Sequence, residues 1–175
     1  GFGDWVEQLI AESTGKLGRG VLPVVLEKSS YELKVEMEDL LLIGLAGNAS
    51  EADHDLVVSG NLGELMLAWE VATAVASRLL EVNPFDQPDV ESAKIAARAL
   101  LESPADGIEY STSASGVDFA ALGFELRSSQ LGENLEQLFE LANEDSYLSI
   151  HCYLNREQVS DAQKLRDLVA RRTYR

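Results

Sequence analysis

Apolar positions along the chain fall into two patterns, one with the spacing of helices and one of short continuous runs. Apolar residues three and four apart predict helices, whereas short apolar runs bounded by turn residues predict strands. The predicted helices are the opening segment, which ends in a polar turn by residue 16, and the segments 61–80, 88–103, 130–143 and 160–173. The predicted strands are 20–27, 40–47, 79–83, 106–114 and 146–154, with a small-residue loop at 111–116.

The order of these segments predicts the class of fold. Strands that alternate with helices indicate crossover connections and a parallel sheet. We therefore predict one α/β domain over residues 1–175, a three-layer sandwich in which helices flank a mainly parallel sheet. In such folds the ligand site lies at the carboxyl ends of the strands. The helix at 61–80 is apolar almost all round, which predicts that it is buried.

Composition and charge narrow the classes of function. The chain has 175 residues, of which 46% are hydrophobic, enough to build a core. Its net charge of −16 disfavours nucleic acid and anionic membranes as partners. The one cysteine, Cys152, lies in an apolar run and is expected to be inert. With no apolar run near the ~20 residues of a membrane span and no leader-like opening, we expect a cytoplasmic protein.

Few residues offer catalytic or metal-binding chemistry. The two histidines do not form a helical pair, so the sequence predicts no metal site. His54 is expected in a solvated loop, and His151 in the core or an interface. The chain lacks a nucleophile elbow, a phosphate-binding P-loop and a glycine-rich dinucleotide motif, so no nucleotide cofactor is expected.

The first acidic segment is "QLIAESTGK" (8–16). On a helix, Gln8 and Glu12 lie on one face because they are four residues apart. Glu12 at the end of a helix, followed by small residues that a ligand can approach closely, can serve as a general base. The simpler interpretation is a helix end, at which Gly15 stops the helix and Lys16 suits the negative end of its dipole.

The second acidic segment is "NPFDQPDVESAK" (83–94). Asp86, Gln87 and Glu91 crowd the start of a helix that has Pro88 near its first turn. Asp86 or Asp89 can cap that helix, and Glu91 suits its positive end. Capping is the ordinary interpretation of this segment.

Together the two segments resemble the phosphoglucose isomerase family. "QLIAESTGK" is similar to the family's Gln-x-x-x-Glu-Ser-x-Gly-Lys stretch, and "FDQPDVESAK" (85–94) to its Phe-Asp-Gln-x-Gly-Val-Glu-x-x-Lys signature, with Asp89 in place of the usual Gly. The segments 5–24, 82–100 and 146–173 look very like the isomerase part of fused transaldolase/phosphoglucose isomerase proteins. The resemblance covers nearly the whole chain and is weakest over 28–55 and 104–130.

The resemblance implies a sugar isomerase (SIS) domain of flavodoxin-like fold. It places Glu12 as the base that moves a proton between carbons 1 and 2 of a sugar phosphate through a cis-enediol, without metal or organic cofactor. Gln8, Ser13, Thr14 and Lys16 become candidate substrate-binding residues. The reaction implied is the interconversion of glucose 6-phosphate and fructose 6-phosphate.

Other parts of the family's site have no match in these residues. The phosphate-binding loop belongs to a first SIS domain, and the ring-opening histidine has no counterpart in "LEKSSYELKVE" (26–36). We therefore expect the chain to be part of a larger protein with two SIS domains, with or without a fused transaldolase. The expected partners are that other SIS domain, a second copy in a homodimer and the sugar phosphate.

Two alternatives remain open. One is a regulatory SIS domain that binds sugar phosphate without turnover. The other is a purely structural role, in which the apolar helix at 61–80 serves assembly. Saturable binding without turnover favours the first alternative. A monomer across micromolar concentrations argues against the second.

Overall fold

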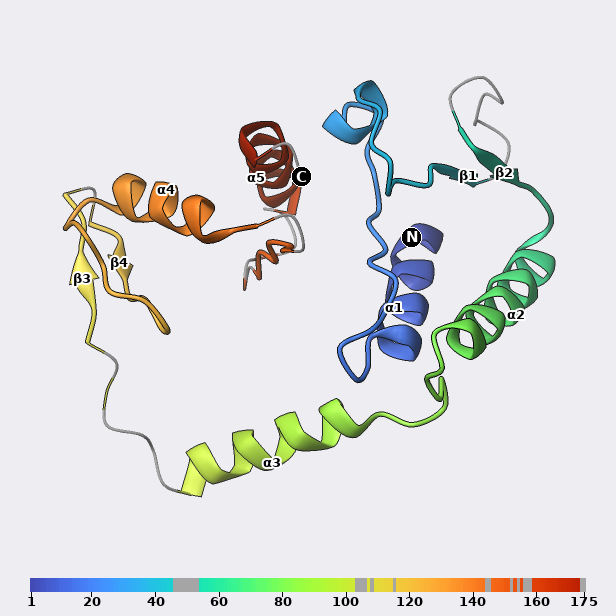
Figure 1. Cartoon of the computed structure of the whole chain (residues 1–175), viewed down its shortest axis with the longest axis horizontal. Helices are drawn as coiled ribbons and strands as arrows, with labels where there is room; N and C mark the ends of the chain where they lie inside the picture. Colours follow the sequence, from blue (N-terminus) through green and yellow to red (C-terminus); the bar gives the residue numbers. More distant parts are fainter. Residues whose placement is uncertain are drawn as a thin grey trace. The chain divides into compact units, whose positions relative to one another are not determined.

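The computed structural model describes residues 1–45, 54–102, 107, 109–114, 116–143, 146–151, 153, 155 and 159–173, and the side chains of the last range from residue 164 on. The chain divides into two compact units, Gly1–Glu102 and Ser103–Arg175. Figure 1 shows the elements in chain order. The expectation that residues 1–175 form a single SIS domain stays a prediction.

The described residues of the first unit form four helices and one small parallel sheet. Its elements are α1 (Phe2–Thr14), the 3-10 helix η1 (Tyr31–Lys34), β1 (Ile43–Leu45), β2 (Leu56–Val58), α2 (Leu62–Leu79) and α3 (Pro88–Glu102). The two strands are parallel, with Ile43 opposite Leu56 and Leu45 opposite Val58. The Asp55 carboxylate accepts a 2.7 Å hydrogen bond from the Leu42 amide just before β1. A parallel sheet with helices beside it confirms the α/β class, while the three-layer sandwich stays a prediction.

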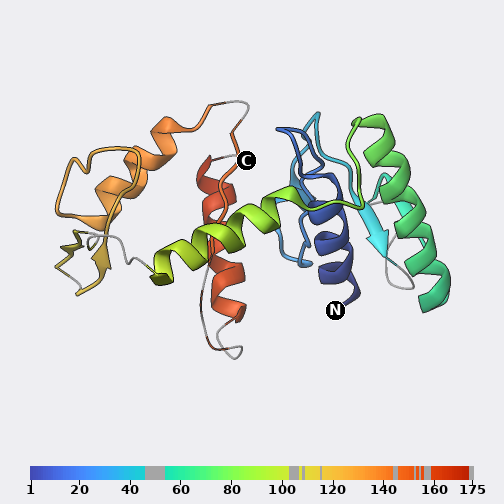
Figure 2. The same cartoon turned by 90° about the horizontal axis from the view of Figure 1, so that it is seen from below.

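Helices α1 and α2 pack side by side in both views (Figures 1 and 2). Val6 of α1 and Leu65 of α2 are among the buried hydrophobic residues. Farther along α2, the buried positions are the small polar residues Thr73 and Ser77. The first turn of α2 is held by a capping box, in which Asn61 and Glu64 each accept the other's backbone N–H. The face of α2 that carries Leu65, Thr73 and Ser77 is therefore buried in the first unit.

The opposite face of α2 is apolar and exposed. Leu67, Val71, Val75 and Leu79, four residues apart, are between 54% and 80% exposed. The predicted burial of the 61–80 helix is thus confirmed for one face only. Its boundaries agree with the predicted ones within two residues.

The second unit combines a short antiparallel pair of strands with two helices. Its elements are β3 (Ser111–Thr112), β4 (Asp118–Phe119), α4 (Leu131–Leu141) and α5 (Val159–Thr173). Two buried amide side chains of α4 hold the preceding segment, because Asn134 donates to the Ser128 carbonyl at 2.7 Å and Gln137 donates to the Glu125 carbonyl at 2.9 Å. Arg172 of α5 forms an ion pair with Glu136 at 2.7 Å.

Several predicted strands are wrong. Residues 20–27 and 79–83 form no strand, and the described residues of 146–154 form none either. Among the described residues of 106–114, Ser111 and Thr112 alone are in a strand, so part of the predicted loop at 111–116 is strand β3. A strand requires a neighbouring backbone for its hydrogen bonds, and an apolar run alone does not supply one. Strands β2 and β4 were not predicted.

The apolar run at 20–27, which follows α1, packs against that helix and is not part of a sheet. A Cβ on Gly3 of α1 would approach the side chain of Val25 to 3.2 Å. Pro23 also lacks the N–H that a central strand uses in its ladder. Among the helices in the described ranges, none combines the length and apolarity needed to cross a bilayer.

Candidate functional site

The end of α1 is shaped by a tight turn at Gly15. This residue has φ −73° and ψ 76°, and the Lys16 amide donates to the Thr14 carbonyl at 2.9 Å, which together form an inverse γ-turn. A Cβ at Gly15 would lie only 2.8 Å from the Ala11 carbonyl oxygen. The predicted end of the helix at Gly15 is confirmed. Its φ is negative, so glycine is favoured there because a Cβ would collide with the Ala11 carbonyl oxygen.

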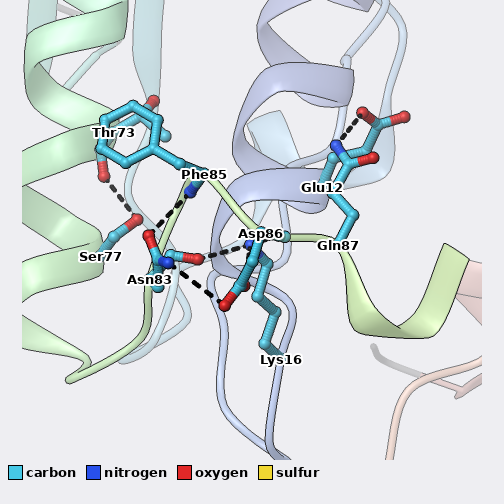
Figure 3. Close-up of polar contacts among 8 residues, drawn as sticks. All are labelled: Glu12, Lys16, Thr73, Ser77, Asn83, Phe85, Asp86 and Gln87. Atoms are coloured by element: carbon cyan, nitrogen blue, oxygen red, sulfur yellow. Dashed lines mark hydrogen bonds and ion pairs between the residues drawn. The ribbon is translucent and has the colours of Figure 1, made fainter. Parts of the chain in front are cut away.

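Glu12, on the last turn of α1, accepts hydrogen bonds from two glutamines. Gln8 donates to Oε1 at 3.1 Å from one turn earlier, as the helical spacing predicted. Gln87 donates to Oε2 at 3.3 Å from the segment just before α3 (Figure 3). All three side chains are exposed. Two amide donors therefore orient a carboxylate that remains accessible from solvent.

Gln87 is the site residue that sequence reasoning did not place. Its position predicted only helix capping, and it is 75 residues from Glu12 in the chain. No local periodicity connects residues that far apart. The only available signal was that both residues belong to segments that resemble one family.

A small pocket borders Glu12. Its volume is about 80 Å³, and it is lined by Glu12, Gly15, Lys16, Gln87, Pro88, Asp89 and Val90. Sites that enclose small ligands have volumes of roughly 300–1,000 Å³. This pocket is therefore too small to enclose a sugar phosphate by itself.

Thr14 and Ser13 were predicted to bind substrate. The Thr14 side chain is fully buried, where its hydroxyl donates to the Ile10 carbonyl at 2.8 Å and accepts from the Val21 amide at 3.1 Å. These bonds tie the end of α1 to the segment that follows. Ser13 is half-buried beside it. The geometry gives Thr14 a structural task, and the substrate-binding role of both residues stays a prediction.

Lys16, also a predicted substrate-binding residue, is buried in the structure. Its side chain is 4% exposed. The ammonium group donates to the Asn83 carbonyl at 2.6 Å, to the Asp86 carbonyl and to the Asp86 carboxylate at 3.3 Å. A buried charge is tolerated when it is paired and hydrogen-bonded, and Lys16 meets both conditions. Its geometry favours fixing the turn before α3.

That turn is also held by its own side chains (Figure 3). Asn83 accepts from the Phe85 amide at 3.1 Å and donates to the Asp86 carboxylate at 3.2 Å. The Asp86 carboxylate thus binds Lys16 and Asn83 and does not cap α3, which corrects one of the capping alternatives. Glu91 forms an ion pair with Lys94 at 2.9 Å within α3.

The charge of the pocket is mainly negative. Both Glu12 and Asp89 line it, and the ammonium of Lys16 already has acceptors. Asp89 is exposed. These two carboxylates disfavour a phosphate group in the pocket, because like charges at short distance repel.

The two histidines and the cysteine are the remaining candidates from the sequence. His54 is half-buried just before β2. His151, expected in the core or an interface, is exposed and its Nε2 lies 2.9 Å from the Ser149 hydroxyl. Cys152 is outside the described residues. Over the described part of the chain, no group of three acidic, histidine or cysteine side chains is placed to hold a metal ion.

A comparison with curated proteins finds relatives that are named glucose-6-phosphate isomerase. The chain is 30% identical over 156 aligned residues to the glucose-6-phosphate isomerase of Bacillus thuringiensis (strain Al Hakam), which covers 59% of this chain and 35% of the relative. The isomerases of the same name from Bacillus cereus (strain B4264) and Bacillus anthracis match equally well. The match spans about a third of the length of these relatives.

No protein-family model and no solved structure matches the chain. The curated relatives nevertheless have the name that the two acidic segments predicted. This chain is therefore related in sequence to the phosphoglucose isomerase family.

Proposed function

We propose that this chain supplies the proton-transfer base of an isomerase that interconverts glucose 6-phosphate and fructose 6-phosphate. The observation that carries the proposal is the geometry of Glu12. Its carboxylate is exposed, lines a pocket and accepts from Gln8 and Gln87. The relatives are named for this reaction, which supports the choice of substrate.

The proposed chemistry uses the free electron pairs of the Glu12 carboxylate. In the open-chain aldose, Glu12 takes the proton from carbon 2, and the electron pair of the broken C–H bond forms the C1–C2 double bond while the carbonyl π pair moves to O1, which takes a proton from solvent to give the cis-enediol. Glu12 then returns its proton to carbon 1, and the hydroxyl on carbon 2 releases its proton to solvent as the C2 carbonyl of the ketose forms. Because an ionised carboxylate only accepts hydrogen bonds, the two glutamine amides hold it without protonating it.

We further propose that a second part of the protein completes this site. The pocket of about 80 Å³ is too small to enclose a hexose phosphate, and its carboxylates repel phosphate. A second SIS domain of the same protein would supply the phosphate-binding groups and the group that opens the sugar ring. A fusion to transaldolase is compatible with this arrangement and is not required by it.

The test is a coupled isomerase assay on the full natural protein with Glu12→Gln. Loss of a positioned general base lowers kcat by about 10²–10⁴-fold. The matched control is Glu7→Gln, which removes the same charge from another exposed position of α1.

We expect Glu7→Gln to retain the wild-type rate. Equal rates for Glu12→Gln and wild type would remove Glu12 from the mechanism. If the wild-type protein binds sugar phosphate saturably and turns over none, the non-catalytic SIS domain is the better account.

A further inference from the structure

Two cations of the turn after α1 bind the segment between α2 and α3. Lys16 binds the Asn83 and Asp86 carbonyls and the Asp86 carboxylate. Arg19 donates to the Leu80 carbonyl at 2.9 Å and to the Glu81 carboxylate at 2.8 Å. The two cations therefore hold neighbouring but different parts of the same connection.

Lys16 is presented to its partners by a constrained backbone. Its amide donates to the Arg19 carbonyl at 3.0 Å, and the Arg19 amide donates back to the Lys16 carbonyl at 2.9 Å. Leu17 and Gly18 between them have φ values of 56° and 71°. Two successive positive φ values are those of a tight type I′ turn, and the leucine adopts a conformation that L residues rarely take. The direction of Lys16 is thus set by local structure.

The segment that Lys16 holds leads directly to Gln87. Asp86 is the residue before Gln87, and both its carbonyl and its carboxylate accept from the Lys16 ammonium. Gln87 itself precedes Pro88, so its backbone is restricted to extended conformations. Asp86 on one side and Pro88 on the other therefore restrain the backbone of Gln87 at the place from which its side chain reaches Glu12.

We propose that Lys16 is a positioning residue, which holds the Asn83–Asp86 turn so that the Gln87 amide meets the Glu12 carboxylate. Its place in the reaction rests on the proposed function, whereas its effect on Gln87 does not. Lys16 touches neither substrate nor reacting atoms in this account. The proposal replaces direct substrate binding by Lys16 with an action through Gln87.

The first test measures the Gln87 side chain without any substrate. The full natural protein is labelled with ¹⁵N-glutamine, and the side-chain amide signals of Gln87 are identified by their loss in Gln87→Ala. We expect Lys16→Met to move these signals to the positions of a mobile glutamine. The matched control Arg19→Met removes a cation from the same turn and should leave them in place.

Asn83→Ala is a second variant that tests the same proposal if Lys16→Met does not fold. Asn83 is exposed, and its side chain holds the same turn through Phe85 and Asp86. We expect Asn83→Ala to shift the Gln87 signals in the same direction as Lys16→Met. Unchanged Gln87 signals in a folded Lys16→Met protein, or in Asn83→Ala if the former does not fold, overturn the proposal.

The second test uses the isomerase assay. Displacing a catalytic group by about 1 Å can cost 10²-fold in rate, so we expect Lys16→Met to lower kcat at least tenfold with little change in KM. In a Gln87→Ala background, Lys16→Met should have no further effect on kcat, because the two residues act as one unit. Additive effects would overturn the action through Gln87. If the Gln87 signals shift in Lys16→Met while Glu12→Gln is fully active, the positioning role of Lys16 is supported and the proposed function is overturned.

Discussion

At the scale of single residues, the site depends on how one carboxylate is oriented. Gln8 and Glu12 could be paired from the sequence because the helical repeat alone brings them together. Gln87 could not, because its contact with Glu12 depends on how α3 and the preceding turn lie against α1. The contacts of Lys16 could not be predicted for the same reason, since its acceptors include backbone carbonyls that the sequence pattern does not reveal, and its substrate-binding role stays a prediction.

Asp89 provides a prediction at this scale. It stands where the resembling family usually has glycine, and it adds a second carboxylate to the pocket beside Glu12. Asp89→Asn should lower the KM for sugar phosphate about two- to fivefold, because an exposed charge interaction is worth roughly 0.2–1 kcal/mol.

The dependence on ionic strength is the control for the predicted effect of Asp89→Asn on KM. The difference in KM between Asp89→Asn and wild type should shrink as ionic strength rises, because salt screens exposed charges. A KM that is equal in both proteins at low salt would show that the phosphate lies beyond the field of Asp89.

At the scale of elements, helices could be predicted and strands mostly could not. The helices α2, α3, α4 and α5 follow the predicted segments closely because their spacing signals are local. The apolar runs at 20–27 and 146–154 have the composition of strands, yet the structure gives their described residues no strand partner. Strand formation depends on a neighbouring strand that can be far along the chain, and composition does not identify that neighbour.

Gly15 supports a prediction about the end of α1. In Gly15→Ala the new methyl group would lie 2.8 Å from the Ala11 carbonyl oxygen, so the helix end must shift. We expect a loss of about 1–3 kcal/mol in the free energy of unfolding, the usual cost of such a clash. Denaturant unfolding measures it.

Gly63→Ala is the matched control. Gly63 lies in the first turn of α2, where a Cβ would have its nearest contact at 3.5 Å, with Asn61. Alanine is a better helix former, so this variant should gain about 0.5–1 kcal/mol. Equal stabilities of the two variants would contradict the tight contact at Gly15.

At the scale of the whole molecule, the described residues bury few large apolar side chains. Only Val6, Leu65, Val82 and Ala170 are buried hydrophobic residues among them, and α3 has no buried residue. The four exposed apolar residues Leu67, Val71, Val75 and Leu79 form a stripe along one face of α2, called here the α2 stripe. Surfaces of this kind are typical of interaction sites.

We propose that a second copy of the chain covers the α2 stripe, in keeping with the expected homodimer. Light scattering of the 175-residue chain at micromolar concentration should give a mass of about twice 19.1 kDa. Val71→Lys, within the stripe, should return it to a monomer, because a charge is costly to bury. Glu70→Lys, at the neighbouring exposed position, should leave the dimer intact; a monomeric wild type would contradict the proposal.

Glu12 is the group that we propose moves the proton between carbons 1 and 2. The most direct measurement is the uptake of deuterium at carbon 2 of glucose 6-phosphate from heavy water, catalysed by the full natural protein. We predict that the wild type and Glu7→Gln incorporate deuterium at equal rates, and that Glu12→Gln is slower by about 10²–10⁴-fold. Incorporation by Glu12→Gln at the wild-type rate would contradict the account.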